Sequence, residues 1–305
     1  MKSAVSANRK IGGSGRGILL VTLAAVLWSS SGLFAKAPVF GEWDVPTRVA
    51  LMSFWRALFA ALVIVFLVRK PGWSWRMMPM MVSFGAMNWS FLQALVATEA
   101  TTAIWLQYTA PVYVLLGSVF LFRETIKRRD VWFVVVSFSG LAIILSGQIS
   151  HASGAGLVYG ILAGVFYAGV ILSLRGLREF DSAWLVFLNL AATAIAFLPI
   201  CIMLDTGPVG GQWVYLGGFG VVQLGLPYVL FARGLRTITS HEASLVVLLE
   251  PVLVPVWVFL AWRHEASYEP PSLTTLAGAI LILASLIARY GSAVRTVRVS
   301  KKAGD

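Results

Sequence analysis

The sequence predicts an all-α integral membrane protein whose ten transmembrane helices form two inverted five-helix repeats. Three observations carry this prediction. The 305 residues are 58% hydrophobic and only 12% charged, with a mean hydropathy of +0.83, whereas a soluble protein of this size needs more charge to cover its surface. The apolar residues gather in runs long enough to cross a bilayer. One hydrophobic pattern also returns about 140 residues later in the chain.

Ten apolar runs have the length of about 17 to 25 residues that a helix needs to cross the hydrocarbon layer. The first run follows basic residues, as a signal peptide would, but it lacks a clear cleavage site and many runs follow it. We therefore expect it to be retained as a span. The expected spans are 17–38, 46–68, 75–97, 100–122, 130–148, 155–175, 182–204, 212–232, 240–262 and 272–290.

The placement of Lys and Arg predicts that both termini lie in the cytoplasm, because cytoplasmic loops are enriched in positive charge. With the N-terminus inside, all but four of the 24 Lys and Arg residues fall in inside segments. Lys36, Arg48 and Arg263 lie at outer ends, and Arg56 lies within a span. The net charge of +11 thus reflects orientation in a membrane, and we expect no nucleic-acid partner.

The internal repeat divides the chain into two halves. Ala94–Pro111 resembles Gly234–Pro251, and each is followed by an apolar run that ends in Glu. Gly17–Lys36 matches Gly156–Arg175 at an offset of 139. Because five is odd, the second copy enters the membrane upside down, and inverted repeats give a transporter two related conformations. The expected organisation is a basic tail at 1–16, repeats at 17–148 and 155–290, and a second basic tail at 291–305.

Four strings in this order resemble the EamA-type ten-helix carriers of the drug/metabolite transporter superfamily. They are LAAVLWSSSGLFAK (Leu23–Lys36), FWRALFAALV (Phe54–Val63), TAPVYVLLGSVFLFRE (Thr109–Glu124) and LEPVLVPVWVFLAWRHE (Leu249–Glu265). The resemblance implies export or exchange of small metabolites, often amino acids, across the inner membrane. The terminal Glu stands thirteen residues after Pro111 but fourteen after Pro251, a departure from the repeated pattern.

Two charged residues inside apolar runs are the main candidates for a binding site. An ionisable side chain near the bilayer centre costs a few kcal/mol, so it should face a partner, the bundle interior or water. Arg56 is either a cation for a substrate carboxylate or a tether between helices. Glu250 is expected to exchange protons, to bind a cationic substrate group, or to form a static pair with Arg56 or another helix.

Neutral polar and aromatic residues at similar depth complete the predicted site. Amide side chains can hydrogen-bond to charged groups without the desolvation cost of a charge. Aromatic rings can stack on apolar groups or on ammonium. For each alone, contact between helices is the plainer role. The binding candidates besides Arg56 and Glu250 are Asn88, Gln107, Tyr108, Trp28, Tyr167 and Gln223. Pro111 and Pro251 are candidate hinges, because proline frees a backbone carbonyl.

Catalytic and metal chemistry find no support in the sequence. His151, His241 and His264 fall in loops or at span ends, no Walker-type motif is present, and we expect no cofactor or metal site and no enzyme activity. A passive channel would need a continuous polar stripe, and a non-transporting scaffold would leave Arg56 and Glu250 unexplained. We therefore expect a secondary transporter that acts on a small-molecule metabolite in the lipid bilayer as a monomer or homodimer. Protons and the substrate gradient are the two alternatives for its energy source.

Overall fold

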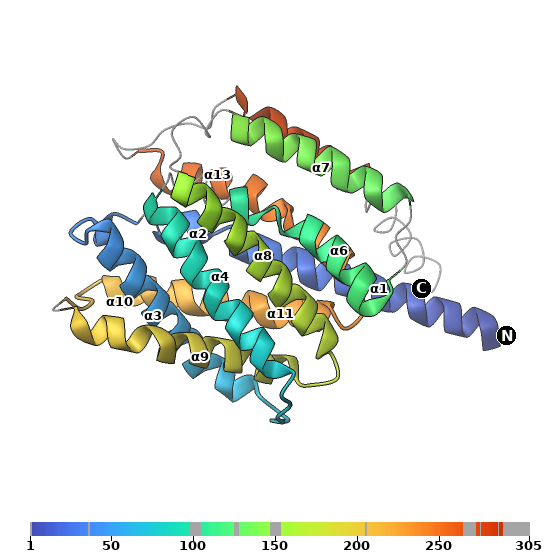
Figure 1. Ribbon diagram of the computed structural model, residues 1–305, viewed down its shortest axis with the longest axis horizontal. Coiled ribbons are helices and arrows are strands. Elements are labelled where there is room, and N and C mark those ends of the chain that lie inside the picture. Colours follow the sequence, from blue (N-terminus) through green and yellow to red (C-terminus); the bar gives the residue numbers. More distant parts are fainter. Residues whose placement is uncertain are drawn as a thin grey trace, which may run out of the picture.

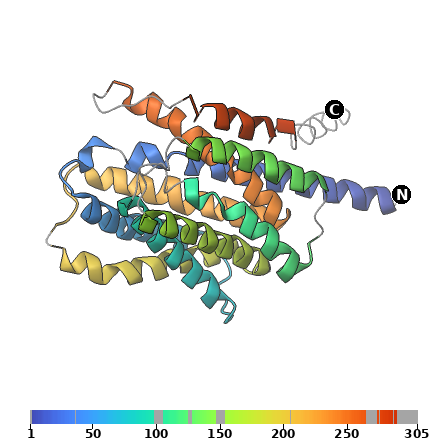
Figure 2. The ribbon, with the colours of Figure 1, turned by 45° about the horizontal axis from the view of Figure 1, so that its top comes forward.

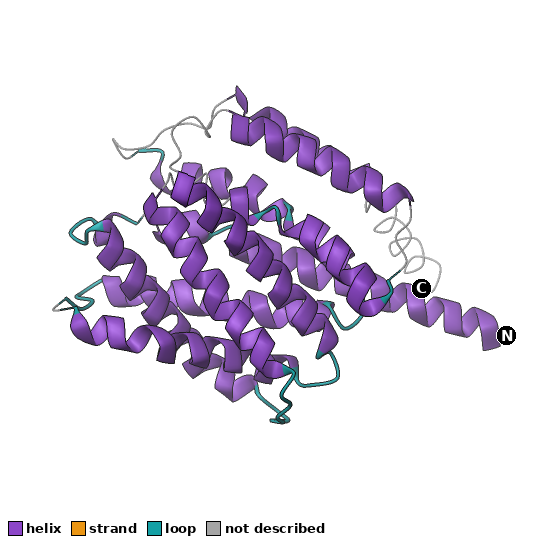
Figure 3. Cartoon of the chain, in the orientation of Figure 1, coloured by secondary structure: helices purple, strands orange, loops and turns teal. Residues whose placement is uncertain are grey.

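The computed structural model is helical throughout the part of the chain that it describes (Figures 1 and 3). It describes residues 2–35, 37–97, 105–124, 128–146, 154–204, 206–264, 273–274, 276–285 and 287–288. Six helices among these residues are long and apolar enough to cross a membrane. The all-helical membrane class is confirmed, whereas the count of ten spans and the inversion of the repeat stay predictions. Lys36, His151 and Glu265 lie outside the described residues.

The observed helices follow the predicted runs closely in both halves. The first half contains α1 (Lys2–Trp28), α2 (Ser31–Ala35), α3 (Val45–Ile64), α4 (Met77–Ala97), α6 (Ala110–Phe122) and α7 (Arg128–Ser146). The second half contains α8 (Gly154–Gly176), α9 (Ser182–Met203), α10 (Gln212–Gly218), η4 (Phe219–Gly225), α11 (Leu226–Gly234), α12 (Ser240–Val247) and α13 (Leu249–Trp262). One further apolar helix runs from Leu276 to Ser285. Helix α1 begins earlier than expected, within the segment predicted as a basic tail.

Several predicted spans are interrupted rather than continuous. The first breaks at Ser29 and Ser30, whose hydroxyls each donate to a carbonyl three residues earlier at 2.6 Å, a local bond that competes with the helix. Span eight contains η4, a π-helix, and such wide turns often mark functional sites. Helices α6 and α13 start after Thr109 and Leu248, which both adopt right-handed helical backbone angles with ψ near −10°.

The two interruptions before α6 and α13 lie 139 residues apart, at the same place in each repeat. Pro111 is the second residue of α6 and Pro251 the third of α13. The first N–H groups of a helix have no partner within it, so proline there removes no hydrogen bond. The two prolines therefore stand where a new helix begins, and their role as hinges stays a prediction.

Helices from the two halves pack against each other. Helix α4 lies along α8, α3 along α9, and α1 along α11 (Figure 1). Glycine permits one close approach: a Cβ on Gly164 of α8 would lie 2.5 Å from the Thr109 hydroxyl oxygen and 3.1 Å from the Gln107 carbonyl oxygen. Helix α7 packs beside the helix 276–285 (Figure 2), where a Cβ on Gly140 would lie 2.8 Å from the Gly278 carbonyl oxygen.

The outer surface of the bundle is apolar. Large hydrophobic side chains such as Phe66, Phe120 and Met203 are more than 80% exposed. Soluble monomers rarely show large continuous apolar surface, so this surface suits contact with lipid. The buried polar residues, by contrast, lie inside the bundle, and they include Asn88, Asn189 and Gln223.

Loops at one end of the bundle are tied together by Asp181, and we call this end the basic end (residues 68–76, 123–124, 175–181 and 233–239). The Asp181 carboxylate caps α9 through the N–H of Ala183 and accepts hydrogen bonds from the N–H groups of Arg69 and Lys70, at 2.7 to 3.1 Å. Burial raises the pKa of Asp181, but these backbone hydrogen bonds outweigh it and lower that pKa. The α3–α4 and α8–α9 connections are thereby joined.

The contact between α3 and η4 yields a stability prediction. A Cβ on Gly220 would lie 2.5 Å from the Arg56 carbonyl oxygen and 3.2 Å from the Ala60 nitrogen. Both are backbone atoms of α3, which cannot shift easily to make room. Gly220→Ala should therefore destabilise the protein by about 1–3 kcal/mol, the usual cost of overpacking. In Gly217→Ala the added Cβ meets nothing within 4 Å, and alanine favours helix. We expect thermal unfolding in detergent to show a lower midpoint for Gly220→Ala only; equal midpoints would contradict this packing.

Candidate functional site

The interrupted helices surround a cavity of about 90 Å³. A cavity needs about 10–15 Å³ of such space to hold one water molecule, so this cavity admits several. All eight residues predicted to bind substrate line it, and their binding role stays a prediction. The lining residues are Trp28, Ser31, Arg56, Met87, Asn88, Phe91, Gln107, Tyr108, Tyr167, Gln223, Leu224, Tyr228 and Glu250.

Arg56 projects from α3, and its guanidinium contacts Asn88 and Phe219. Its Nη2 donates to Oδ1 of Asn88 at 2.9 Å, and the Asn88 Nδ2 donates to the Phe84 carbonyl at 2.9 Å. The guanidinium carbon lies 5.1 Å from the centre of the Phe219 ring, within cation–π range. Its Nε is buried and has no hydrogen-bond partner. Arg56 thus tethers α3 to α4 through an amide, and it keeps a donor to spare.

Glu250 lies in the first turn of α13, directly after the interruption at Leu248. The free N–H groups at a helix N-terminus favour a negative charge there. The Tyr108 hydroxyl is the polar neighbour of this carboxyl group. Tyr108 stands in the corresponding interruption before α6. The acidic group of the cavity and its phenol partner therefore come from matched breaks in the two halves.

The two charges on the cavity wall are not neutralised by each other. The ion pairs among the described residues join Arg76 to Glu179 and Glu124 to Arg175 and His241. Neither Arg56 nor Glu250 has such a partner within 4.0 Å among those residues. The expectation of a static pair between them is therefore not met in this conformation. A buried charge without a partner costs several kcal/mol, so each of these two groups, when charged, favours a partner of opposite sign.

Aromatic rings form the apolar part of the wall around Trp28. The Trp28 ring lies 4.7 Å from Tyr228, 6.5 Å from Tyr167 and 5.2 Å from Phe231, measured between centroids. Gln223 donates from Nε2 to the Trp28 carbonyl at 3.2 Å. The Trp28 Nε1 and the Gln223 Oε1 are buried without a partner. Because buried polar atoms are nearly always hydrogen-bonded, these atoms provide one donor and one acceptor for a polar ligand.

Tyr228 is a cavity residue that sequence reasoning did not identify. Its ring packs on Trp28, and its hydroxyl lies 3.9 Å from the Met87 sulfur. In a regular helix, residues five apart differ by about 140° in direction, so Gln223 and Tyr228 would not share a face. The π-turn of η4 ends between them and changes the register. A further signal was available, since Tyr228 lies 140 residues after Asn88.

The remaining cavity residues that the sequence did not single out are mostly apolar. Ser31, Met87, Phe91 and Leu224 carry no chemical signal that separates them from lipid-facing or packing residues. In the described part of the chain, no three His, Cys, Asp or Glu side chains gather where they could hold a metal ion. The arrangement therefore offers a cation, an anion, amides and aromatic faces around one small space, which suits recognition of a small polar molecule.

Comparison with known proteins gives relatives over nearly the whole chain. An uncharacterized transporter of Archaeoglobus fulgidus is 28% identical over 270 residues, covering 88% of this chain and 93% of that protein. The Pseudopaline exporter CntI of Pseudomonas aeruginosa is 27% identical over 284 residues, covering 89% and 95%. The Threonine/homoserine exporter RhtA of Escherichia coli is 29% identical over 305 aligned positions, covering 93% and 92%.

The fold is also found in a solved crystal structure, with a TM-score of 0.72 at 17% identity, covering 92% of this chain and 97% of that one. The family model described as "EamA-like transporter family" matches residues 15–146 and 154–289. These relatives are transporters and not enzymes. The family model matches both halves of the chain, and the apolar helices are long enough to cross a membrane. The chain is therefore a multi-pass membrane protein that belongs to the EamA-like transporter family.

Proposed function

We propose that this protein is a secondary transporter that exports or exchanges small amphipathic metabolites, foremost amino acids, across the inner membrane. One observation carries the choice of substrate. Arg56 and Glu250 line a single cavity and neither has an ion-pair partner among the described residues. A zwitterion carries the two complementary charges in one molecule, so a single ligand would compensate both part-buried groups at once.

The polar groups of the cavity suggest how a zwitterion would lie. The substrate carboxylate takes the side of Arg56, whose unpartnered Nε adds a charge-assisted hydrogen bond. The substrate ammonium takes the side of Glu250, with the free Oε1 of Gln223 as a further acceptor. The rings of Trp28 and Tyr228 form an apolar face for the rest of the molecule. Two exporters among the relatives, for pseudopaline and for threonine or homoserine, agree with this class.

Alternating access is the mechanism that the repeat supports. We propose ten spans in two inverted repeats, 17–148 and 155–290, with cytoplasmic basic tails at 1–16 and 291–305. The matched interruptions before α6 and α13 support this arrangement, because inverted repeats can exchange conformations around a fixed site. We assign the basic end of the bundle to the cytoplasm, because cytoplasmic loops are enriched in Lys and Arg.

The small volume of the cavity supports a conformational cycle. Binding pockets for drug-sized ligands have about 300–1,000 Å³, whereas this cavity has about 90 Å³. In the proposed cycle the helices around it separate on one side to admit a metabolite. Glu250 is the proposed proton carrier, since an intramembrane carboxylate commonly serves a proton pathway. Otherwise the substrate gradient alone drives export.

Counterflow in proteoliposomes tests the proposed function directly. Purified protein is reconstituted into liposomes loaded with an unlabelled amino acid, and uptake of the same radiolabelled amino acid is followed. We expect transient accumulation above the level in protein-free liposomes, because an exchanger couples exit to entry. A panel of amino acids identifies the substrate. If no amino acid in the panel exchanges, the proposed substrate class is wrong.

Substitution of the two charges tests the site. A hydrogen bond to a charged group contributes about 1.5–3 kcal/mol, so Arg56→Ala and Glu250→Gln should each reduce exchange by about tenfold or more. Glu250→Gln should also abolish any pH dependence of net transport. The control is Arg263→Ala, because Arg263 stacks on Phe259 at 5.4 Å but does not line the cavity. Normal exchange by Arg56→Ala at normal expression would remove Arg56 from the site.

A further inference from the structure

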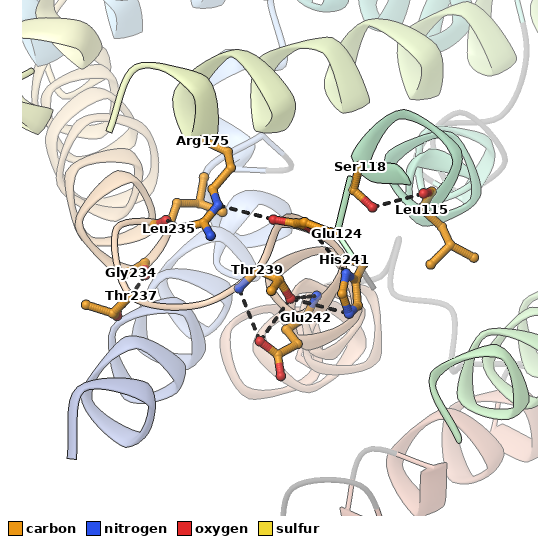
Figure 4. A network of polar contacts seen from close by, with 10 residues as sticks. All are labelled: Leu115, Ser118, Glu124, Arg175, Gly234, Leu235, Thr237, Thr239, His241 and Glu242. Carbon is orange, nitrogen blue, oxygen red and sulfur yellow. Dashed lines mark hydrogen bonds and ion pairs between the residues drawn. The ribbon is translucent and has the colours of Figure 1, made fainter. Parts of the chain in front are cut away.

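A buried carboxylate joins four helical segments at the basic end of the bundle (Figure 4). Glu124 follows α6, and its Oε1 lies 3.3 Å from the Nε of Arg175 in α8. Its Oε2 lies 3.3 Å from the Nδ1 of His241 in α12. Arg175 also donates from Nη1 to the carbonyl of Leu235, just after α11, at 2.6 Å. One acidic group of the first half thus connects three segments of the second.

This cluster differs from the other ion pair at the same end. The side chains of Glu124, Arg175 and His241 are only 5–13% exposed, whereas those of Arg76 and Glu179 are 62% and 51% exposed. Exposed ion pairs contribute little, but removing one partner of a buried pair leaves an uncompensated charge. The buried cluster therefore resists separation of its helices far more than the exposed pair does.

Local bonds hold the cluster in its geometry. The Nε2 of His241 lies 3.3 Å from the Thr239 hydroxyl, so both ring nitrogens have a polar neighbour. Thr239 in turn forms a capping box with Glu242 at the start of α12. Burial raises the pKa of Glu124, but the hydrogen bond with His241 and the charge of Arg175 outweigh it and hold that pKa below its usual value. The carboxylate is thus charged at neutral pH.

Each segment that meets at Glu124 also carries a cavity residue. Tyr108 precedes α6, Tyr167 lies in α8, Tyr228 lies in α11, and Glu250 follows α12 across the interruption at Leu248. Helix α6 has 13 residues, so its two ends lie about 20 Å apart at 1.5 Å per residue. Movement of these segments at the basic end therefore changes the walls of the cavity at their other ends.

We propose that Glu124, Arg175 and His241 form a latch that closes the cavity toward the basic end and comes apart once in each transport cycle. This inference rests on the proposed alternating access. In the conformation described here the latch is closed. Opening on that side must break the bonds of Glu124 to both partners, so the latch sets how often the cavity faces the basic end. Glu242 supports the latch as a positioning residue, through Thr239.

Accessibility of a single thiol measures the state of the latch. Cys201 is the one cysteine of the chain, so Cys201→Ala gives a background in which Ser31→Cys places a thiol on the cavity wall. A membrane-impermeant maleimide is then applied to inside-out vesicles. Glu124→Gln should raise the labelling rate by about fivefold or more, a typical size for a conformational coupling. His241→Asn should raise it less, because Arg175 remains paired.

Glu179→Gln is the matched control, since it removes an acidic group from an exposed ion pair at the same end. Its labelling rate should equal that of the background, and gel filtration checks that every variant stays folded. Unchanged labelling in both Glu124→Gln and His241→Asn overturns the latch. If labelling rises but the parent protein exchanges no substrate in counterflow, the latch stands and the proposed function fails.

Discussion

The separation of one positive and one negative charge around a small cavity is the constraint on which the structure depends. Arg56 and Glu250 lie inside an apolar bundle, where a charge is costly, yet they do not pair with each other. Each is instead partly satisfied by a neutral neighbour, Asn88 for the cation and Tyr108 for the anion. A neutral neighbour leaves room for a ligand that a fixed counter-ion would exclude.

The interruptions of the helices follow from the same constraint. A continuous helix has no free backbone groups in its middle, whereas the start of a helix such as α13 favours a negative charge nearby. Both halves have an interruption at the corresponding position, at Thr109 and at Leu248, 139 residues apart. They then differ by one residue: Pro111 stands two positions after Thr109, and Pro251 stands three after Leu248. The second copy thus has room for Glu250 between the break and the proline.

Much of the fold and the membership of the cavity wall could be predicted from the sequence. Helix bounds in spans such as 182–204 agree with α9 to one residue, because hydrophobic length marks a membrane helix. The eight candidate residues converge because polar groups inside apolar runs must face the interior of the bundle. What they bind was not predictable in the same way, because it depends on the distances between side chains from different helices.

Other features could not be predicted from the sequence, for identifiable physical reasons. The π-turn of η4 and the break at Ser29 and Ser30 depend on backbone packing and local hydrogen bonds that leave no hydrophobic pattern. Tyr228 reaches the cavity only through the changed register after that turn. Glu124 stood out only as the repeated terminal Glu, and its partners Arg175 and His241 lie 51 and 117 residues away. Such contacts arise from tertiary structure alone.

Binding of substrate derivatives that lack one charge tests the two-charge account most directly. Once a transported amino acid is known, its radiolabelled form is bound to purified protein in detergent and displaced by the unlabelled amino acid, its methyl ester or its N-acetyl derivative. The account predicts that removing either charge weakens displacement by about tenfold or more, since a hydrogen bond to a charged group contributes about 1.5–3 kcal/mol. Equal displacement by all three compounds would contradict it.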